Sequence, residues 1–188
     1  KTVRLPERIR SRILIAGCTH REDEEIVFSA LSELLKSGIG VFIAPRNIVR
    51  CDEVIRRGKE LGFDGLKAGT GKGRDFTVID SMGVLDRYYS DSEWAFVGGT
   101  FKDLGGHNIM EPAQSGCRVL FGPFIRNFAQ EAAELIRLGI GLKIENADDL
   151  AAALNSLEHP DWEGFAELLA INQVCFENLV KRVGNEIA

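Results

Sequence analysis

The sequence predicts an α/β domain built on a Rossmann-like, doubly wound parallel sheet, and two observations support this prediction. Short apolar runs of strand length alternate along the chain with longer segments that have the apolar spacing of helices. Many of the 20 glycines stand where one of the short runs ends. Strands that alternate with helices form parallel βαβ units, whose helices cover both faces of one sheet. The 188 residues are expected to form one domain with a sizeable core.

The order of the expected elements follows from these patterns. Strands are expected where apolar runs stop at glycine, proline or a polar residue, at residues 12–17, 41–44, 63–67, 76–80, 94–99, 118–123 and 141–144. Helical spacing predicts helices at about residues 22–36, 49–61, 83–89, 108–115, 128–138 and 147–157, and in the tail at 162–183. The segment 68–75 is rich in glycine and polar residues and is expected to be a loop.

The first helix has an acidic start and an apolar face. Its first turn is expected to be solvated, and it holds Glu22, Asp23, Glu24 and Glu25. Carboxylates in a first turn suit the positive end of the helix dipole. The face that packs on the sheet is expected to be formed by Ile26, Val27, Ala30, Leu31, Leu34 and Leu35.

Composition and charge exclude several classes of protein. A net charge of -5 and a pI near 5.3 argue against a nucleic-acid-binding surface. No apolar run approaches the roughly 20 residues that span a bilayer, and no signal peptide is recognisable. The cysteines are expected to be free thiols in a reducing compartment, because no metal-type spacing joins Cys18, Cys51, Cys117 and Cys175. The first residue is Lys1, so we expect a fragment of a longer protein, opening on a basic, solvated linker.

Parallel sheets bind ligands at the carboxyl ends of their strands, so the segments after the strands are the candidates for a site. Gly17–His20 could turn backbone N–H groups toward a phosphate, but it lacks the GxGxxG spacing of dinucleotide folds. His20 is a candidate for either a ligand contact or a local hydrogen bond. After the second strand, Pro45 is followed by Arg46, whose guanidinium could bind a phosphate or be an ordinary surface charge.

Two further segments follow later strands. In Asp80–Val84, a base ring could lie against the backbone and Met82, or Ser81 could cap the next helix with Met82 in the core. The segment from Gly98 to Pro112 holds two glycine pairs, which let the backbone approach a ligand closely. There Asn108 is expected to cap a helix. Glu111 could complete a capping box, or it could be a buried carboxylate that binds ribose hydroxyls.

These motifs resemble those of one family. Gly105-Gly106-His107-Asn108, with Glu111-Pro112 and then Phe121-Gly122-Pro123, closely resembles 3-deoxy-D-manno-octulosonic acid (Kdo) transferases. Gly17-Cys18-Thr19-His20 resembles that family's Gly-Ser-Thr-His, Pro45-Arg46 its Pro-Arg-His, and Asp80-Ser81-Met82-Gly83 its Asp-Thr-Met-Gly. The motifs follow the family's order across nearly the whole chain, and they cover only its carboxyl-terminal half.

The resemblance implies a fold and an activity. Kdo transferases have the GT-B fold, in which two Rossmann-like domains face each other, and residues 1–188 would be the donor-binding domain. The family transfers Kdo from CMP-Kdo to the lipid A precursor, lipid IVA, with inversion and without a metal or another cofactor. The resemblance places the full-length protein at the cytoplasmic side of the bacterial inner membrane. It implies that the acceptor binds through the missing amino-terminal domain, which also supplies the membrane association and the catalytic base, and that this fragment is soluble and inactive.

The resemblance also implies particular site residues, each carried over by position. The expected CMP contacts are Pro45, Arg46, Met82, Gly83, Val84, Asn108, Ile109, Met110 and Glu111. Among them, Arg46 would hold the phosphate and Glu111 the ribose. Further donor contacts are expected at Thr19, His20, Gly105 and Gly106. No catalytic residue and no metal ligand is expected in this chain.

The sequence departs from the family pattern in three places. Asn47 replaces the usual His, Val84 replaces a frequent Glu, and Arg21-Glu22 replaces a more usual Pro-Gly. Other readings remain open at this point. One is the donor domain of a GT-B enzyme that uses a UDP-sugar, and another is a nucleotide-binding Rossmann module without enzymatic activity. An NAD-dependent oxidoreductase is disfavoured, because the turn after the first strand lacks the dinucleotide fingerprint.

Overall fold

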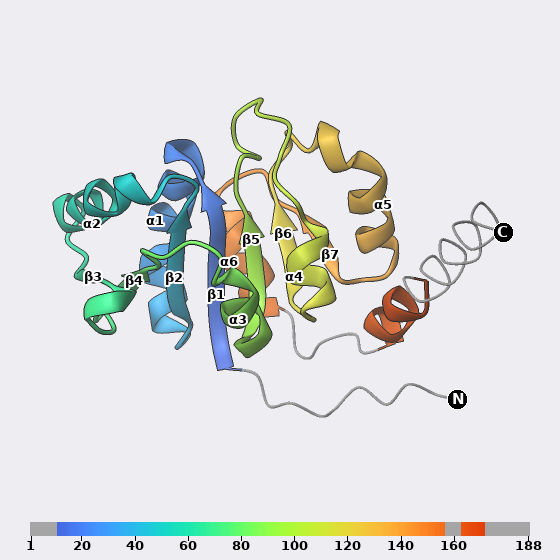
Figure 1. The fold of residues 1–188 in the computed structure, drawn as a ribbon, viewed down its shortest axis with the longest axis horizontal. Helices are drawn as coiled ribbons and strands as arrows, with labels where there is room; N and C mark the ends of the chain where they lie inside the picture. Colours follow the sequence, from blue (N-terminus) through green and yellow to red (C-terminus); the bar gives the residue numbers. More distant parts are fainter. Residues whose placement is uncertain (1–10, 157–162, 172–188) are drawn as a thin grey trace, which may run out of the picture.

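The computed structural model describes residues 11–156 and 163–171, which form a three-layer α/β domain (Figure 1). Its seven strands pair in parallel throughout. They are β1 (Ser11–Thr19), β2 (Gly40–Pro45), β3 (Gly65–Lys67), β4 (Phe76–Val78), β5 (Ser92–Val97), β6 (Arg118–Phe121) and β7 (Gly141–Lys143). This confirms the Rossmann-like fold that the sequence predicts.

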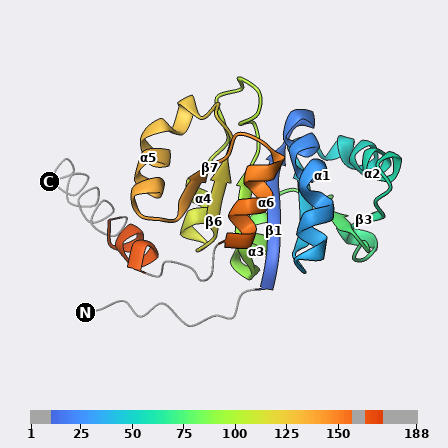
Figure 2. The same ribbon diagram turned by 180° about the vertical axis from the view of Figure 1, so that it is seen from behind.

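The α-helices cover both faces of the sheet. They are α1 (Arg21–Lys36), α2 (Cys51–Glu60), α3 (Leu85–Asp91), α4 (Met110–Gln114), α5 (Ala129–Arg137) and α6 (Ala147–Ser156). Three short 3-10 turns occupy Ile48–Arg50, Ala68–Thr70 and Arg126–Phe128. Helices α3 and α4 lie in front of the sheet in Figure 1, and α1 and α6 lie in front in the reverse view of Figure 2. Of the helix predicted at 162–183, residues 163–171 are helical and the remainder lies outside the described residues.

The strand order explains where a ligand can bind. The order is β3-β4-β2-β1-β5-β6-β7, so β1 to β4 form one half of the sheet, with β3 at the edge and β4 between β3 and β2, and the chain then returns to build the other half from β5. The connections after β1 and β5 therefore leave in opposite directions and open a crevice at their carboxyl ends. Such a switch point is where open α/β sheets bind ligands.

The core of the sheet is apolar on both faces of its central strands. In β1, Leu14, Ile15 and Ala16 are all fully buried, as parallel strands covered by helices on both sides require. The expected face of α1 is largely confirmed, with Val27, Ala30, Leu31 and Leu34 buried and Ile26 and Leu35 half-buried. Phe28, which the spacing did not include, is also buried and packs edge-on against Phe76 with ring centroids 5.3 Å apart.

The acidic start of α1 corrects the sequence-based expectation. Asp23 is 1% exposed and Glu24 is 4% exposed, so the prediction of a solvated first turn is wrong for both. Glu24 accepts hydrogen bonds from the Thr19 hydroxyl at 3.0 Å and from both terminal nitrogens of Arg50 at 3.0 and 2.7 Å. Buried carboxylates persist when hydrogen bonds replace lost hydration, and neither helical periodicity nor residue type indicates such partners.

Asp23 joins two loops that are far apart in the sequence. Its Oδ2 accepts the backbone N–H groups of His20 and Gly99, both at 2.8 Å. Its Oδ1 accepts those of Thr100 at 3.3 Å and Phe101 at 3.1 Å. One buried carboxylate therefore fixes the turn after β1 to the turn after β5, across the switch point.

We predict that Asp23→Asn lowers the free energy of unfolding by about 2–3 kcal/mol, because the amide nitrogen would face backbone donors and leave buried N–H groups without an acceptor. Urea unfolding followed by circular dichroism measures this change. The control is Glu22→Gln, which removes a half-exposed carboxylate whose ion pair with Lys102 spans 2.9 Å. It should change stability by less than about 1 kcal/mol. Similar losses for the two variants would contradict a special role for Asp23.

Candidate functional site

The four post-strand segments meet at one edge of the sheet, the upper edge in Figure 1. The Arg46 N–H donates to the Thr19 carbonyl at 2.9 Å, which ties the end of β2 to the end of β1. The Gly98 N–H donates to the Gly17 carbonyl at 2.9 Å, which ties the end of β5 to β1. The structure thus brings together, around the switch point, segments that are far apart in the sequence.

A small cavity of about 90 Å³ opens between these segments. Its lining includes the predicted residues Pro45, Arg46, Met82 and Gly83, together with Cys18. Met82 is 70% exposed, which is contrary to a place in the core and leaves its side chain available to a ligand. The cavity is smaller than the several hundred Å³ of typical ligand pockets, so it can hold only part of a nucleotide.

Cys18 lines the small cavity beside Arg46, and it was not among the site residues predicted from the sequence. Burial raises the pKa of its thiol, the positive charge of Arg46 lowers it, and the carboxylate of Glu111 raises it. Both charges therefore act on Cys18, and Arg46 lines the small cavity together with it. Cys18 has a φ of 54°, an uncommon value for a residue other than glycine. It stands where the family motif has serine, and only that substitution could have drawn attention to it.

The segment before α4 differs in detail from its prediction. Helix α4 begins at Met110, and the Asn108 side chain accepts the Met110 N–H at 3.0 Å, so Asn108 caps the chain two residues before the helix starts. Glu111 is exposed rather than buried, and among the described residues its carboxylate takes part in no hydrogen bond or ion pair. The expected capping box is therefore not formed there. The carboxylate of Glu111 is free to accept hydrogen bonds from a ligand.

The two glycines before α4 allow the backbone to pack closely against other side chains of the protein. Gly105 has a φ of 87° and Gly106 a φ of 81°, conformations that side chains rarely adopt. A Cβ atom on Gly105 would lie 2.4 Å from the Asn127 amide nitrogen, and one on Gly106 would lie 2.6 Å from a methyl group of Ile125. Both glycines are buried. The predicted contacts of these glycines with a donor stay predictions.

Two histidines face each other across the crevice. The Nε2 atoms of His20 and His107 are 3.1 Å apart, and the rings are stacked at an interplanar angle of 10° with centroids 5.3 Å apart. The pKa of His107 is lowered, first by burial and then by the proximity of His20 and Arg46. His20 was predicted as a candidate from the sequence and His107 was not, although His107 stands inside the Gly-Gly-His-Asn motif.

The other predicted donor contact near β1 has a different environment. Thr19 is fully buried, and its hydroxyl donates to Glu24 at 3.0 Å. Its side chain therefore points into the protein. Its backbone carbonyl accepts the Arg46 N–H, so this residue positions Arg46. A direct contact between Thr19 and a donor stays a prediction.

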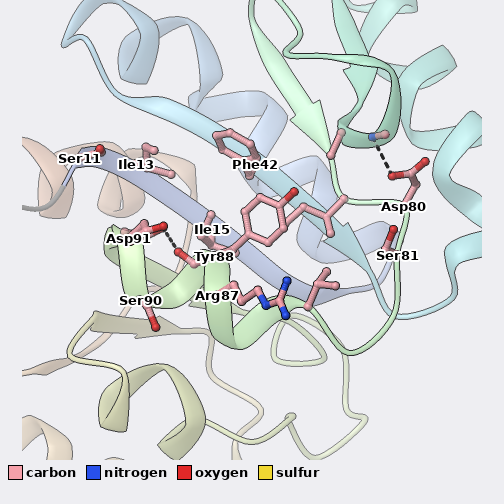
Figure 3. A pocket seen from close by; sticks show the side chains of 15 residues that line it. Ser11, Ile13, Ile15, Phe42, Asp80, Ser81, Arg87, Tyr88, Ser90 and Asp91 are labelled. Carbon is pink, nitrogen blue, oxygen red and sulfur yellow. Dashed lines mark hydrogen bonds between the residues drawn. The ribbon is translucent and has the colours of Figure 1, made fainter.

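A larger cavity of about 670 Å³ lies beside the crevice, on the face of the sheet that carries α3 (Figure 3). Its floor is apolar and includes Ile13, Ile15 and Phe42, and Tyr88 of α3 forms a wall. Val84, a predicted CMP contact, lines this cavity rather than the small one. The loop that carries Met82 thus contributes to both cavities, and its Ser81 lines each of them. Sequence patterns gave no sign of the larger one, because the residues of its floor look like those of any buried strand.

The described residues also limit other kinds of site. Within residues 11–156 and 163–171, no cluster of three or more His, Cys, Asp or Glu side chains is arranged to hold a metal ion. In the same ranges no helix has the length and apolar character to cross a membrane. Cys18, Cys51 and Cys117 are free thiols, and Cys175 lies outside the described residues.

Comparisons with known proteins point to one family, although no protein-family model matches the chain. The chain is 34% identical to the 3-deoxy-D-manno-octulosonic acid transferase of Chlamydophila psittaci over 155 residues, which are 80% of this chain and 36% of that protein. It is 28% identical over 152 residues to the enzyme of the same name from Aquifex aeolicus, covering 80% of this chain and 43% of that one. It is 31% identical to a bifunctional glycosyltransferase/methyltransferase of Fusobacterium nucleatum, over 90% of this chain and 28% of that protein.

The chain thus spans less than half the length of each of these relatives. Among solved structures, it superimposes on the C-terminal CMP-Kdo binding domain of WaaA from Acinetobacter baumannii with a TM-score of 0.75. The two chains are 26% identical, and the match covers 87% of this chain and 90% of that domain. In sequence and in fold, the chain is therefore a relative of the Kdo transferases and resembles their carboxyl-terminal domain.

Proposed function

We propose that this chain is the donor-binding domain of a glycosyltransferase that transfers Kdo from CMP-Kdo to the lipid A precursor, lipid IVA. The observation that carries the proposal is the likeness to the CMP-Kdo binding domain of WaaA over nearly the whole of that domain. The crevice supports it independently, because it gathers a guanidinium and a carboxylate that have no partner among the described residues. The phosphate of a nucleotide can bind to the guanidinium, and its ribose hydroxyls can donate hydrogen bonds to the carboxylate.

Most of the predicted CMP contacts have a definite task in this proposal. Arg46 binds the phosphate of the donor, and Glu111 accepts hydrogen bonds from the ribose hydroxyls. The backbone of Met82, Gly83 and Val84 receives the cytosine ring. Asn108, Ile109 and Met110 shape the turn that presents Glu111. The guanidinium of Arg46 supplies positive charge to the leaving CMP, which is the task that a metal ion performs in other glycosyltransferases.

The remaining parts of the reaction belong to the rest of the proposed protein. We place the acceptor site, the catalytic base and any attachment to the cytoplasmic side of the inner membrane in an amino-terminal domain that faces this one. Transfer with inversion needs a base that removes the proton of the acceptor hydroxyl as it attacks the anomeric carbon. The residues 1–188 act as one donor-binding unit in this arrangement.

The choice of nucleotide is the first test. We expect CMP to raise the melting temperature of the chain more than UMP, AMP or NAD at equal concentration, because binding to the folded state stabilises it by mass action. Differential scanning fluorimetry measures the shifts. A UDP-sugar transferase domain would respond most strongly to UMP, and a dinucleotide-binding module to NAD. Either result would contradict the proposed donor.

The second test removes the two proposed ligands of CMP. Arg46→Ala and Glu111→Ala should each weaken CMP binding about ten- to a hundredfold, since hydrogen bonds to charged groups contribute roughly 1.5–3 kcal/mol. Isothermal titration calorimetry gives the affinities. Matched controls are Arg56→Ala, an exposed arginine of α2, and Gln114→Ala, an exposed residue of α4.

Both controls should bind CMP as the unchanged chain does, and all four variants should keep the same circular dichroism spectrum. A Glu111→Ala variant that loses its fold would assign Glu111 to structure instead of binding. Equal affinity of Arg46→Ala and the unchanged chain would remove Arg46 from the phosphate site.

The third test concerns the chain by itself. Supplied with CMP-Kdo and lipid IVA, it should form no glycosylated lipid, because a base and an acceptor must be held together with the donor in one geometry. Mass spectrometry of the lipid fraction detects the product. The positive control is a full-length Kdo transferase assayed in parallel. Turnover by the chain near that of the control would place the base within these 188 residues and overturn the proposed division of tasks.

A further inference from the structure

The crevice contains three side chains that can carry positive charge, which is more than one phosphate requires. The rings of His20 and His107 hydrogen-bond to each other through their Nε2 atoms, and Arg46 has no ion pair among the described residues. The positive charge of Arg46 lowers the pKa of His107, so the guanidinium acts on the histidine pair. Three groups that can carry positive charge thus gather at one edge, with none of their charge neutralised by a bonded carboxylate in the described parts of the chain.

The proposed donor has a second anionic group that Arg46 alone does not neutralise. Kdo is a sugar acid, so CMP-Kdo carries a carboxylate in addition to its phosphodiester. We propose, on the basis of the proposed function, that His20 and His107 together bind this carboxylate while Arg46 binds the phosphate. The histidine pair then distinguishes a nucleotide-activated sugar acid from a nucleotide or a neutral nucleotide sugar.

The framework around the pair is rigid enough to hold such a group. The backbone N–H of His20 is fixed by Asp23 at 2.8 Å, and that of His107 donates to the Gly98 carbonyl at 3.3 Å. The ring of His107 also lies against Gly99, where a Cβ atom would come within 2.9 Å of it. The two rings are therefore placed by the same buried carboxylate and glycine turn that join β1 to β5.

The geometry of the pair predicts that binding the carboxylate takes up a proton. In the free domain one Nε2 donates to the other, so the pair shares one N–H across 3.1 Å. A carboxylate only accepts, and both rings can donate to it only after one more proton has been added. Two N–H groups that face each other repel unless an anion lies beside both. The charged groups that act on the pair from neighbouring positions are Arg46, Asp23 and Glu22, and the Glu22 carboxylate is paired with Lys102.

The direction of the pH effect follows from this proton. Burial, His20 and Arg46 hold the pKa of His107 below its usual value in the free domain, and a bound carboxylate raises it. Affinity for CMP-Kdo is then highest at a pH below the pKa of the free pair. It falls as the pH rises between the pKa of the free pair and that of the complex, by up to about tenfold per pH unit for one proton.

The test compares two ligands that differ in the sugar acid. Isothermal titration calorimetry measures the binding of CMP-Kdo and of the methyl ester of CMP, which keeps the phosphodiester and lacks the carboxylate. Titrations between about pH 6 and 8, in buffers with different ionisation enthalpies, report proton uptake. We expect close to one proton to be taken up with CMP-Kdo and almost none with the methyl ester. This comparison uses the unchanged chain and does not depend on the folding of any variant.

Variants then locate the effect. His20→Gln and His107→Gln keep a hydrogen-bonding side chain but cannot take up the proton, so each should abolish proton uptake. Each should weaken CMP-Kdo binding about tenfold or more at pH 6, and change binding of the methyl ester by less than about twofold. Lys102→Gln removes a neighbouring positive charge as the control and should leave both ligands unchanged.

The outcomes separate this inference from the proposed function. Equal affinity and equal proton uptake for the two ligands would leave the CMP site standing and overturn the role of the histidines. Equal losses for both ligands in the histidine variants would assign the pair to loop structure only and would also overturn it. Failure of the unchanged chain to bind either ligand would overturn both the inference and the proposed function.

Discussion

The site depends on one buried carboxylate. Asp23 accepts four backbone N–H groups, one from the turn after β1 and three from the turn after β5. These two turns leave the sheet in opposite directions at the switch point, and parallel strand pairing alone does not fix how their loops meet. The carboxylate supplies the missing constraint, because an anion without water is stable only where several donors converge on it. The position of His107 against His20 follows from this arrangement.

The fold could be predicted from the sequence because the patterns that indicate its strands and helices are local. Apolar runs that stop at glycine or proline, such as the one that ends at Pro45, indicate strands, and parallel connections have few arrangements. Element boundaries were less certain, since the last residues of a strand and the first of a loop differ little in composition. The burial of Asp23 and Glu24 was not accessible. Their hydrogen-bond partners, which include Gly99 and Arg50, lie in connecting segments that are distant in the sequence. The spacing of residues along a helix does not indicate such contacts.

The candidate site was predicted in part for the same reason. The rule that parallel strands present their carboxyl ends together selected the turns of Arg46, Met82 and Asn108, and the resemblance to a family gave them tasks. Cys18 and His107 were missed because each acquires its environment from a distant segment. Glu111 had two sequence interpretations, a capping box or a buried ribose-binding carboxylate, and it is exposed without a capping box. A motif specifies neighbours along the chain and not the depth of a side chain in the fold.

Exposure of the crevice bears on how such a domain would work within a larger protein. Arg46, Met82 and Glu111 are all exposed to solvent, at an edge that the described residues of this domain do not cover. Charge interactions at such a surface are weakened by water and by salt. In the proposed two-domain enzyme, a facing domain that excludes water strengthens the contacts of Arg46 and the histidine pair with the donor. Donor affinity and closure are then coupled, since the same charges gain most when the acceptor domain covers them.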